Sequence, residues 1–441
     1  MKNLVTEKVN DNKLKYLKWL IWGCMVLSYV FTFFHSLSMG VVKDYIIKDF
    51  GINDVTFVSM GNVFFYVYLL MQIPTGLLVD TYGSKKVAVT GSLFAGIGAI
   101  LFSYATSFKV LVTGRALIGL GTAVIFVAIL KIISNWFREE EFGTMIGITC
   151  FLGYMGGVLA QSPLATLIEN IGWRSTLRTV GVLSIIIGFL ISFVVSNRPE
   201  DIGLRSPNAH SLNNQIKPNK KEVFIGLWKV ISNPRTWPIM IVFAGFYGTY
   251  VIMMGYYGTS FISDLFGKST IEASKVISFG VIGSAVGAIS IGKISDYVQS
   301  RKKPLIVVGS IYVLIWAYIV YFLDSSLHSN LLAPLMFMVG FTSCAYVISW
   351  PAAKEVNNPK YIGVSTAVAN IGGFIGTIIL PALLANVFEA NRLETDLSMV
   401  YSKAFTVALI AAIISLIMAF FVKETQCKNT YVEKEIKLKT S

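Results

Sequence analysis

Apolar runs long enough to cross a membrane recur along nearly the whole chain. About 20 such residues form a helix that spans the hydrocarbon layer of roughly 30 Å. Of the 441 residues, 54% are hydrophobic and only 14% are charged, which is too apolar for a soluble protein of this length. The pattern predicts an all-α membrane protein with twelve transmembrane helices, at residues 17–41, 55–79, 86–107, 110–137, 143–168, 173–196, 236–263, 271–294, 304–323, 331–353, 360–387 and 401–422.

The net charge of +13 is unevenly divided between the two sides of these helices. When the N-terminus is placed in the cytoplasm, the whole excess of lysine and arginine falls on the cytoplasmic side. Such a positive-inside asymmetry orients membrane proteins. It predicts a multi-pass protein of the plasma (inner) membrane with both termini in the cytoplasm. The basic surface is then expected to contact anionic membrane lipids and not nucleic acid.

The two halves of the chain repeat one plan. Gly76 returns 216 positions later as Gly292, and Asp80 has its counterpart in Asp296 at the same offset. A transporter built from two such halves carries its substrate site near the midplane, between them. We therefore divide the chain into a six-helix half, a polar cytoplasmic linker, a second six-helix half and a cytoplasmic tail, at residues 1–197, 198–235, 236–424 and 425–441.

The repeated loop has a pattern of glycine, aspartate four positions on, glycine three further on, and then basic residues. In this pattern the chain resembles the major facilitator superfamily of transporters, and the resemblance covers essentially its whole length. The second copy departs from the pattern, because Gln299 stands where its last glycine would be. The residues that match, and to which the resemblance assigns a gating role, are Gly76, Asp80, Gly83, Lys85, Lys86, Gly292, Asp296 and Arg301.

The resemblance implies that Asp80 meets the start of the eleventh helix, in the other half, and helps to hold one conformation. By the same logic Asp296 would meet the start of the fifth helix. The physical reason is that a carboxylate is attracted to the positive N-terminal end of a helix. The alternative for the basic residues of both loops is that they mark topology only.

Few ionisable residues lie within the predicted helices, where each is costly unless it faces protein or water. They are His35, Arg115 and Lys131. Arg115 resembles an arginine of the superfamily's fourth-helix motif, which is implicated in substrate or proton handling. Arg115 and Lys131 would lie roughly 24 Å apart on opposite helix faces, so they cannot grip one small ligand together.

Each of these three residues also has a structural alternative. Lys131 either attracts the substrate, or extends to the cytoplasmic interface or pairs with the glutamates at 139–141. His35 is either a packed residue or one with a proton or ligand role. For Arg115, a structural role in pairing and a functional role are equally favoured.

Polar side chains elsewhere complete the candidate path. Tyrosines on a glycine-rich seventh helix suit a pocket that must bind a polar solute and release it. Other matches loosely resemble bacterial sugar-phosphate permease-like proteins. Arg115, Lys131 and the lack of carboxylates in the middle of the predicted helices favour a small polar, anionic organic solute. The further candidates for substrate or coupling contacts are Tyr66, Gln72, Tyr247, Tyr250 and Asn370.

The sequence also contains part of a different transporter pattern. Asn370 before Gly372-Gly373 is half of a nitrate-carrier pattern, whose other half is missing because Tyr154 stands in the fifth helix. A nitrate/nitrite-type carrier, a peptide or amino-acid carrier and a transporter-like sensor remain alternatives. An enzyme is not expected, because the three histidines and four cysteines form no convergent cluster. We expect no metal or cofactor, a monomer, and a proton or counter-solute as a possible coupling partner.

Overall fold

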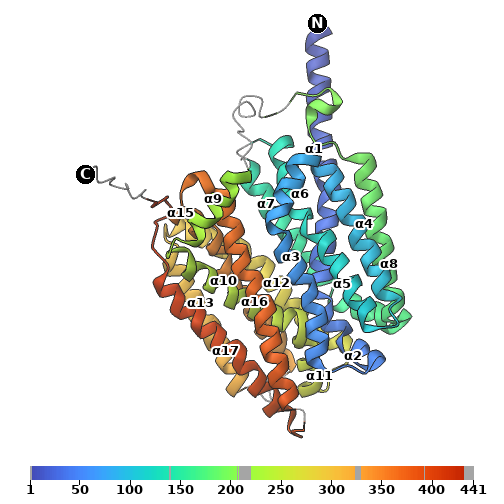
Figure 1. Cartoon of the computed structure of the whole chain (residues 1–441), viewed down its shortest axis with the longest axis vertical. Coiled ribbons are helices and arrows are strands. Elements are labelled where there is room, and N and C mark those ends of the chain that lie inside the picture. The colour runs from blue at the N-terminus through green and yellow to red at the C-terminus, as the bar shows by residue number, and fades with distance from the viewer. Residues whose placement is uncertain are drawn as a thin grey trace, which may run out of the picture.

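The computed structural model describes residues 2–138, 141–205, 207, 220–322, 329–391 and 393–431, and all regular structure within these ranges is helical. Two bundles of long helices stand side by side, one from each half of the chain (Figure 1). The start of the chain and the linking helix Lys220–Ile231 both lie toward one end of the molecule, which we call the terminal side. The other end is called the far side.

The first half crosses the membrane region six times. Ser38 separates α1 from α2, and Val124 separates α5 from α6, so each of these pairs is one span with a local break. Within α8 the chain reverses at Gly172, whose φ of 76° is not helical. The elements are α1 (Lys2–Leu37), α2 (Met39–Phe50), α3 (Asp54–Tyr82), α4 (Ser84–Ser103), α5 (Phe108–Ala123), α6 (Ile125–Trp136), α7 (Phe142–Leu159) and α8 (Ser162–Val194).

The second half repeats this course after two short linking helices, η2 (Pro199–Ile202) and α9 (Lys220–Ile231). Its first span contains a π-helical turn, η4, and its fourth contains a 3-10 turn, η5. The elements are α10 (Thr236–Val251), η4 (Ile252–Tyr257), α11 (Gly258–Phe266), α12 (Thr270–Tyr297), α13 (Lys302–Tyr321), α14 (Ser329–Ser343), η5 (Cys344–Ile348), α15 (Ser349–Val356), η6 (Pro359–Tyr361), α16 (Ile362–Ala390) and α17 (Leu397–Phe421).

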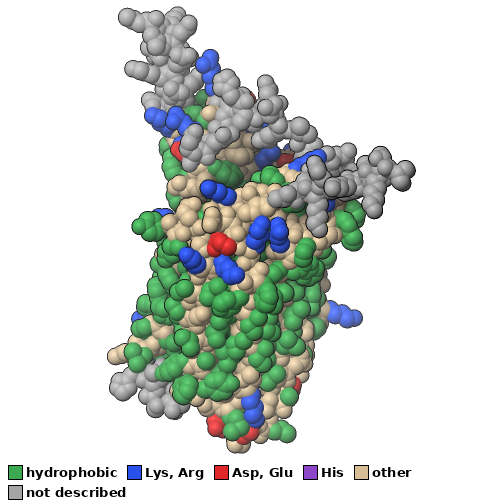
Figure 2. All heavy atoms as spheres, turned by 90° about the vertical axis from the view of Figure 1, so that its left-hand side faces the viewer, with side chains coloured by type: hydrophobic (Ala, Val, Ile, Leu, Met, Phe, Trp, Pro, Cys, Tyr) green, Lys and Arg blue, Asp and Glu red, His purple; other side chains and the backbone are tan. Residues whose placement is uncertain are grey.

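Among the described residues, eleven helical stretches are long and apolar enough to cross a membrane. One of them, Phe142–Val194, holds two crossings because of the reversal at Gly172. The predicted twelve-helix fold is therefore confirmed. Figure 2 shows a broad belt of hydrophobic side chains around the middle, with lysines and arginines gathered above it. Such a belt fits the hydrocarbon layer, because apolar side chains lose nothing by facing lipid.

Glycines let the helices within each half approach closely. A Cβ at Gly121 would lie 2.3 Å from the carbonyl oxygen of Gly91, so the backbones of α5 and α4 are in close contact there. In the second half a Cβ at Gly340 would lie 1.7 Å from the carbonyl oxygen of Gly280, which joins α14 to α12. Close backbone packing of this kind holds membrane helices together where no hydrophobic drive exists between them.

The internal repeat extends to the backbone of the loops. Gly51 and Gly267 both end a helix in the left-handed conformation, with φ of 61° and 60°. At the motif loop Gly83 has φ of 83°, and its counterpart Gln299 also has a positive φ, of 50°. A positive φ is thus kept at this position in the second half although its glycine is gone. A side chain at positive φ costs roughly 1–2 kcal/mol.

We expect Gln299→Gly to stabilise the protein by about 1 kcal/mol, because glycine removes that backbone cost. The reciprocal Gly83→Gln is the matched control and should destabilise. A Cβ there would lie 2.7 Å from the amide nitrogen of Asn197. Thermal unfolding of the purified variants in detergent measures both. A lower unfolding temperature for Gln299→Gly would contradict the interpretation that the backbone conformation at this position is repeated although the glycine is not.

Candidate functional site

A cavity of about 2320 Å³ lies between the two halves. Its walls come from α1, α3, α6 and α7 of the first half and from α10, α12, α15 and α16 of the second. The lining reaches Asp80 and Phe142 on one wall and Lys354 and Ile362 on the other, all near the terminal side. The cavity therefore opens toward that side.

Aromatic side chains form the inner part of the cavity. The hydroxyl groups of Tyr154 and Tyr346 share a hydrogen bond that joins the first half to the second. Phe243 stacks on Tyr346 with ring centroids 4.9 Å apart, and Tyr247 packs on the same ring at 5.1 Å. Flat apolar faces edged by hydroxyl groups suit a small solute with both carbon and polar parts.

Amide groups add directional hydrogen bonding to this surface. Asn370 lies on α16, and its side-chain oxygen accepts a hydrogen bond of 2.7 Å from the indole nitrogen of Trp350. Gln72 lines the opposite wall, on α3. Between them, Tyr68 of the first half and Phe374 of the second pack with ring centroids 4.7 Å apart. Neutral donors and acceptors thus face the cavity from both halves.

The structure brings together three of the five polar candidates. Gln72, Tyr247 and Asn370 line the cavity. Tyr66 does not, because its side chain is 49% exposed on another face of α3. Tyr250 does not either, because it is buried below the lining and only 1% exposed.

The lining residues that were missed from the sequence include Tyr68, Tyr154, Tyr346 and Trp350. One signal was available for the first. Residues four positions apart share a helix face, so Gln72 points to Tyr68 and not to Tyr66. Tyr346 sits in the 3-10 turn η5, and no periodicity in the sequence announces that break.

Arg115 lies just beyond the inner end of the cavity. Its side chain donates to the carbonyl oxygen of His35 at 2.8 Å and to that of Gly61 at 3.4 Å. Its guanidinium carbon is 4.6 Å from the ring centroid of Phe64, which lines the cavity. Among the described residues no carboxylate forms an ion pair with it. The cavity therefore has an uncompensated positive charge one aromatic ring behind its lining.

His35 is as deeply buried as Arg115, and the imidazole Nε2 has no hydrogen-bond partner in the described part of the chain. One guanidinium nitrogen of Arg115, Nη2, also has no hydrogen-bond partner in the described part of the chain. Both groups lie outside the cavity lining. Two unsatisfied polar atoms near one buried cation are costly in a membrane interior.

Lys131 forms an ion pair of 2.9 Å with Asp80 at the mouth of the cavity. The predicted pairing of Lys131 with the glutamates at 139–141 is wrong for Glu141, which pairs with Lys18 at 2.8 Å. Glu139 and Glu140 lie outside the described residues. Arg115 and Lys131 have different contact partners, and their action on separate sites stays a prediction.

Two of the residues with a predicted gating role lie at the mouth of the cavity. Gly76 and Asp80 line one wall of the mouth, while the start of α16 lines the other. The expected contact of Asp80 with the eleventh helix is therefore not made in this state. A Cβ at Gly76 would meet no atom within 4 Å, as expected at an open mouth. The backbone N–H of Lys85, at the start of α4, donates to the Asn197 side chain at 2.8 Å, and Lys86 follows it in the same turn.

In the second half the same loop carries a network of ion pairs. Arg301 binds Asp296 at 2.6 Å and Glu355 at 2.7 Å. Asp296 thus pairs within its own half and not with the start of the fifth helix. Burial opposes the charge of Arg301, but the hydrogen bonds that it donates to Glu355 and Asp296 outweigh burial and raise its pKa. Gly292 lies one turn earlier on α12, with open space around it.

The tail after α17 closes this network. Burial alone would raise the pKa of Glu424, but hydrogen bonds from Ser300 and from backbone N–H groups outweigh it and lower that pKa to about 2. One of those groups is the backbone N–H of Arg301, at 3.0 Å. Glu424 thus serves the second half as Asn197 serves the first, by capping the start of the helix that follows the loop.

Three curated relatives illustrate what the chain is similar to. A probable hexose phosphate transport protein of Chlamydia trachomatis is 22% identical over 403 residues, which are 85% of this chain and 86% of the relative. The probable sulfoacetate transporter SauU of Cupriavidus necator is 21% identical, over 84% and 87% of the two chains. The probable galactarate/D-glucarate transporter GudP of Escherichia coli is 23% identical, over 82% and 85%.

Solved structures share the fold. A bacterial homologue of the human lysosomal transporter Spinster, in an inward-facing and unoccupied conformation, superposes with a TM-score of 0.73 at 17% identity, over 92% of this chain and 96% of that one. The nucleoside transporter NupG gives 0.70 at 15% identity, over 92% and 98%. The family model of the Major Facilitator Superfamily matches residues 21–381. The chain therefore belongs to the Major Facilitator Superfamily, as its loop motif predicted.

Proposed function

We propose that this protein is a secondary transporter that carries a small anionic organic solute across the plasma membrane by alternating access. The terminal side faces the cytoplasm, because the excess of basic residues lies there. The state described above is then the inward-facing one. The single observation that carries the anionic preference is Arg115, a buried cation without a carboxylate partner among the described residues, directly behind the cavity.

The electrostatic argument depends on distance and medium. Phe64 separates Arg115 from the cavity, so an anion at the inner end would lie about 8 Å from the guanidinium group. At an effective dielectric constant of about 20, such a pair attracts by roughly 2 kcal/mol. Lys293 and Lys354 line the cavity as well, while the carboxylate of Asp80 is already paired with Lys131. The field in the cavity therefore favours a negative solute.

The organic part of the solute is recognised by the aromatic and amide groups of the inner cavity. Rings such as Phe243 and Tyr247 offer carbon surfaces, and Gln72 and Asn370 offer hydrogen bonds. Hexose phosphate, sulfoacetate and glucarate, for which the relatives are named, all combine an anionic group with a short carbon skeleton. This agreement supports the proposed class of solute.

The lining also bears on coupling. Its single carboxylate within the described residues is Asp80, at the mouth and in an ion pair. A proton relay through carboxylates deep in the cavity is thereby disfavoured. We propose exchange for a counter-solute as the coupling mode.

The test of the anionic preference is removal of the charge behind the ring. Arg115→Met should weaken binding of a stabilising anion about 30-fold, which corresponds to the roughly 2 kcal/mol estimated above. Arg115→Lys should retain most of it. Thermal shift of purified protein against organic anions, followed by flux in proteoliposomes, measures both.

Arg178→Met is the matched control. This arginine also lies over an aromatic ring, 4.0 Å from the Tyr104 centroid, but outside the cavity lining. It should leave anion binding unchanged. Stabilisation by cationic solutes alone, or an equal loss in both variants, would sink the proposal.

A second prediction concerns closure of the mouth. Asp80→Asn removes the charge that would meet the N-terminus of α16, so it should disfavour the outward-facing state by about 0.3–2 kcal/mol. Lys131→Met should act in the opposite direction, because it frees the full charge of Asp80 for that helix end. Shifts of this size change a two-state population several-fold.

Cysteine labelling reads this population. In a background without the four native cysteines, Thr366→Cys reports the open mouth, since Thr366 lines the cavity. Met39→Cys reports the far side, where Met39 is buried between the halves. Asp80→Asn and Lys131→Met should shift the labelling rates in opposite directions. A shift in the same direction in both would show that Asp80 and Lys131 mark topology only.

A further inference from the structure

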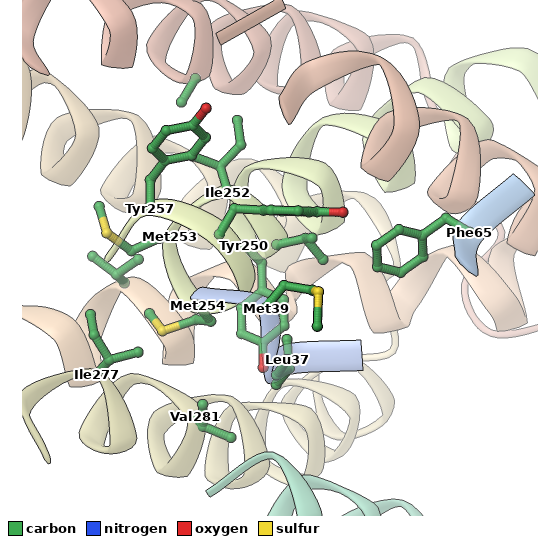
Figure 3. Close-up of a cluster of buried hydrophobic side chains, with 14 of the residues drawn as sticks. Leu37, Met39, Phe65, Tyr250, Ile252, Met253, Met254, Tyr257, Ile277 and Val281 are labelled. Atoms are coloured by element: carbon green, nitrogen blue, oxygen red, sulfur yellow. The ribbon is translucent and has the colours of Figure 1, made fainter. Parts of the chain in front are cut away.

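On the far side the two halves are in direct contact. Figure 3 shows Leu37 and Met39 of the first half close to Met254 of the π-helical turn of the second. The backbones of the two halves also meet here, because a Cβ at Gly40 would lie 3.4 Å from the backbone of Gly255. This layer separates the inner end of the cavity from the far side.

Two amide side chains fasten the layer. Asn62 donates to the carbonyl oxygen of Ile378 at 2.8 Å and accepts from the hydroxyl of Tyr256 at 3.0 Å. Gln161 donates to the carbonyl oxygen of Met254 at 3.0 Å. A π-helical turn leaves carbonyl groups out of the regular helical ladder, so η4 offers acceptors to the opposite half. These bonds must break when the far side opens.

Lys43 adds a charge to this contact. It lies on α2, is 3% exposed, and forms an ion pair of 2.6 Å with Asp54 of its own half. Its ammonium nitrogen also lies 4.2 Å from the ring centroid of Tyr257 and 5.2 Å from that of Phe388. Both rings belong to the second half. The Lys43 ammonium group therefore contacts a carboxylate of the first half and two aromatic rings of the second.

The two kinds of partner respond differently to opening. Asp54 moves together with Lys43, because both belong to the first half, so their ion pair is common to both states. Tyr257 and Phe388 would be carried away with the second half. The cation–π contacts consequently exist only while the far side is closed, and they are strongest when the cation is shielded from water.

We propose that Lys43 is a positioning residue that latches the far side of the transporter shut. It acts through the rings of Tyr257 and Phe388 and does not touch the solute, since it lies outside the cavity lining. The proposal rests on the alternating access proposed above, but not on the nature of the solute. Loss of the charge should raise the population that is open on the far side.

The experiment measures labelling of Met39→Cys without solute, in full-length protein free of the native cysteines and reconstituted in proteoliposomes. We expect Lys43→Met to speed labelling about tenfold, because labelling follows the open population. Tyr257→Leu together with Phe388→Leu should do the same while the lysine remains. Anion binding by thermal shift should be unaffected, so failure of this proposal is distinguishable from failure of the proposed function.

Arg174→Met is the matched control on the same side. Arg174 pairs with Asp49 at 3.5 Å and lies 4.3 Å from the ring centroid of Trp173, and all three belong to the first half. The Arg174→Met variant loses an ion pair and a cation–π contact, as Lys43→Met does, but neither contact crosses between the halves. Its labelling rate should remain that of the parent protein.

Lys43→Met leaves Asp54 buried without its partner, which could impair folding. Lys43→Met with Asp54→Asn removes both charges and should again speed labelling. Labelling by this double variant or by the ring variant that is no faster than in Arg174→Met would overturn the proposal. So would faster labelling in Arg174→Met itself.

Discussion

A charge inside the hydrocarbon layer has to be paired, shielded or turned toward water, and the working parts of this protein follow from that cost. Lys131 reaches the mouth of the cavity, where Asp80 neutralises it. Lys43 is shielded by Asp54 and two rings. Arg115 is held by two backbone carbonyl groups, which accept from Nε and Nη1 but leave Nη2 without a partner in the described part of the chain and the charge uncompensated. In the proposed function, that remaining charge attracts the anionic solute.

The contrast between contacts within and between the halves explains how the cavity can change sides. Within each half, glycines such as Gly121 and Gly340 bring backbones together, and such packing has no alternative arrangement. Between the halves, the far side depends on single side chains such as Asn62 and Gln161, which reach carbonyl groups of the opposite half. Bonds of this kind can be exchanged for water one by one. Two rigid bodies with a separable contact are what alternating access requires.

Hydropathy and the repeat were enough to predict the twelve spans and the two halves, because both depend on composition over long stretches. The site was harder to predict, since it depends on which face of a helix is turned inward. Tyr66 was chosen in place of Tyr68 for that reason. Lys43 was missed because the predicted first helix ended at residue 41, whereas the helical course continues to Phe50. Gln299 shows the reverse case, in which the backbone keeps a conformation that its sequence disfavours.

The two ends of the transport path are closed by unequal chemistry. On the far side a buried cation sits among aromatic rings, where water and salt screen it little. At the mouth the corresponding contact depends on Asp80, whose side chain is 42% exposed and already shared with Lys131. A screened surface charge contributes less than a shielded one. Without solute the balance should therefore favour the state that is open at the mouth, and a bound anion that draws the halves together there supplies the difference needed to reverse it.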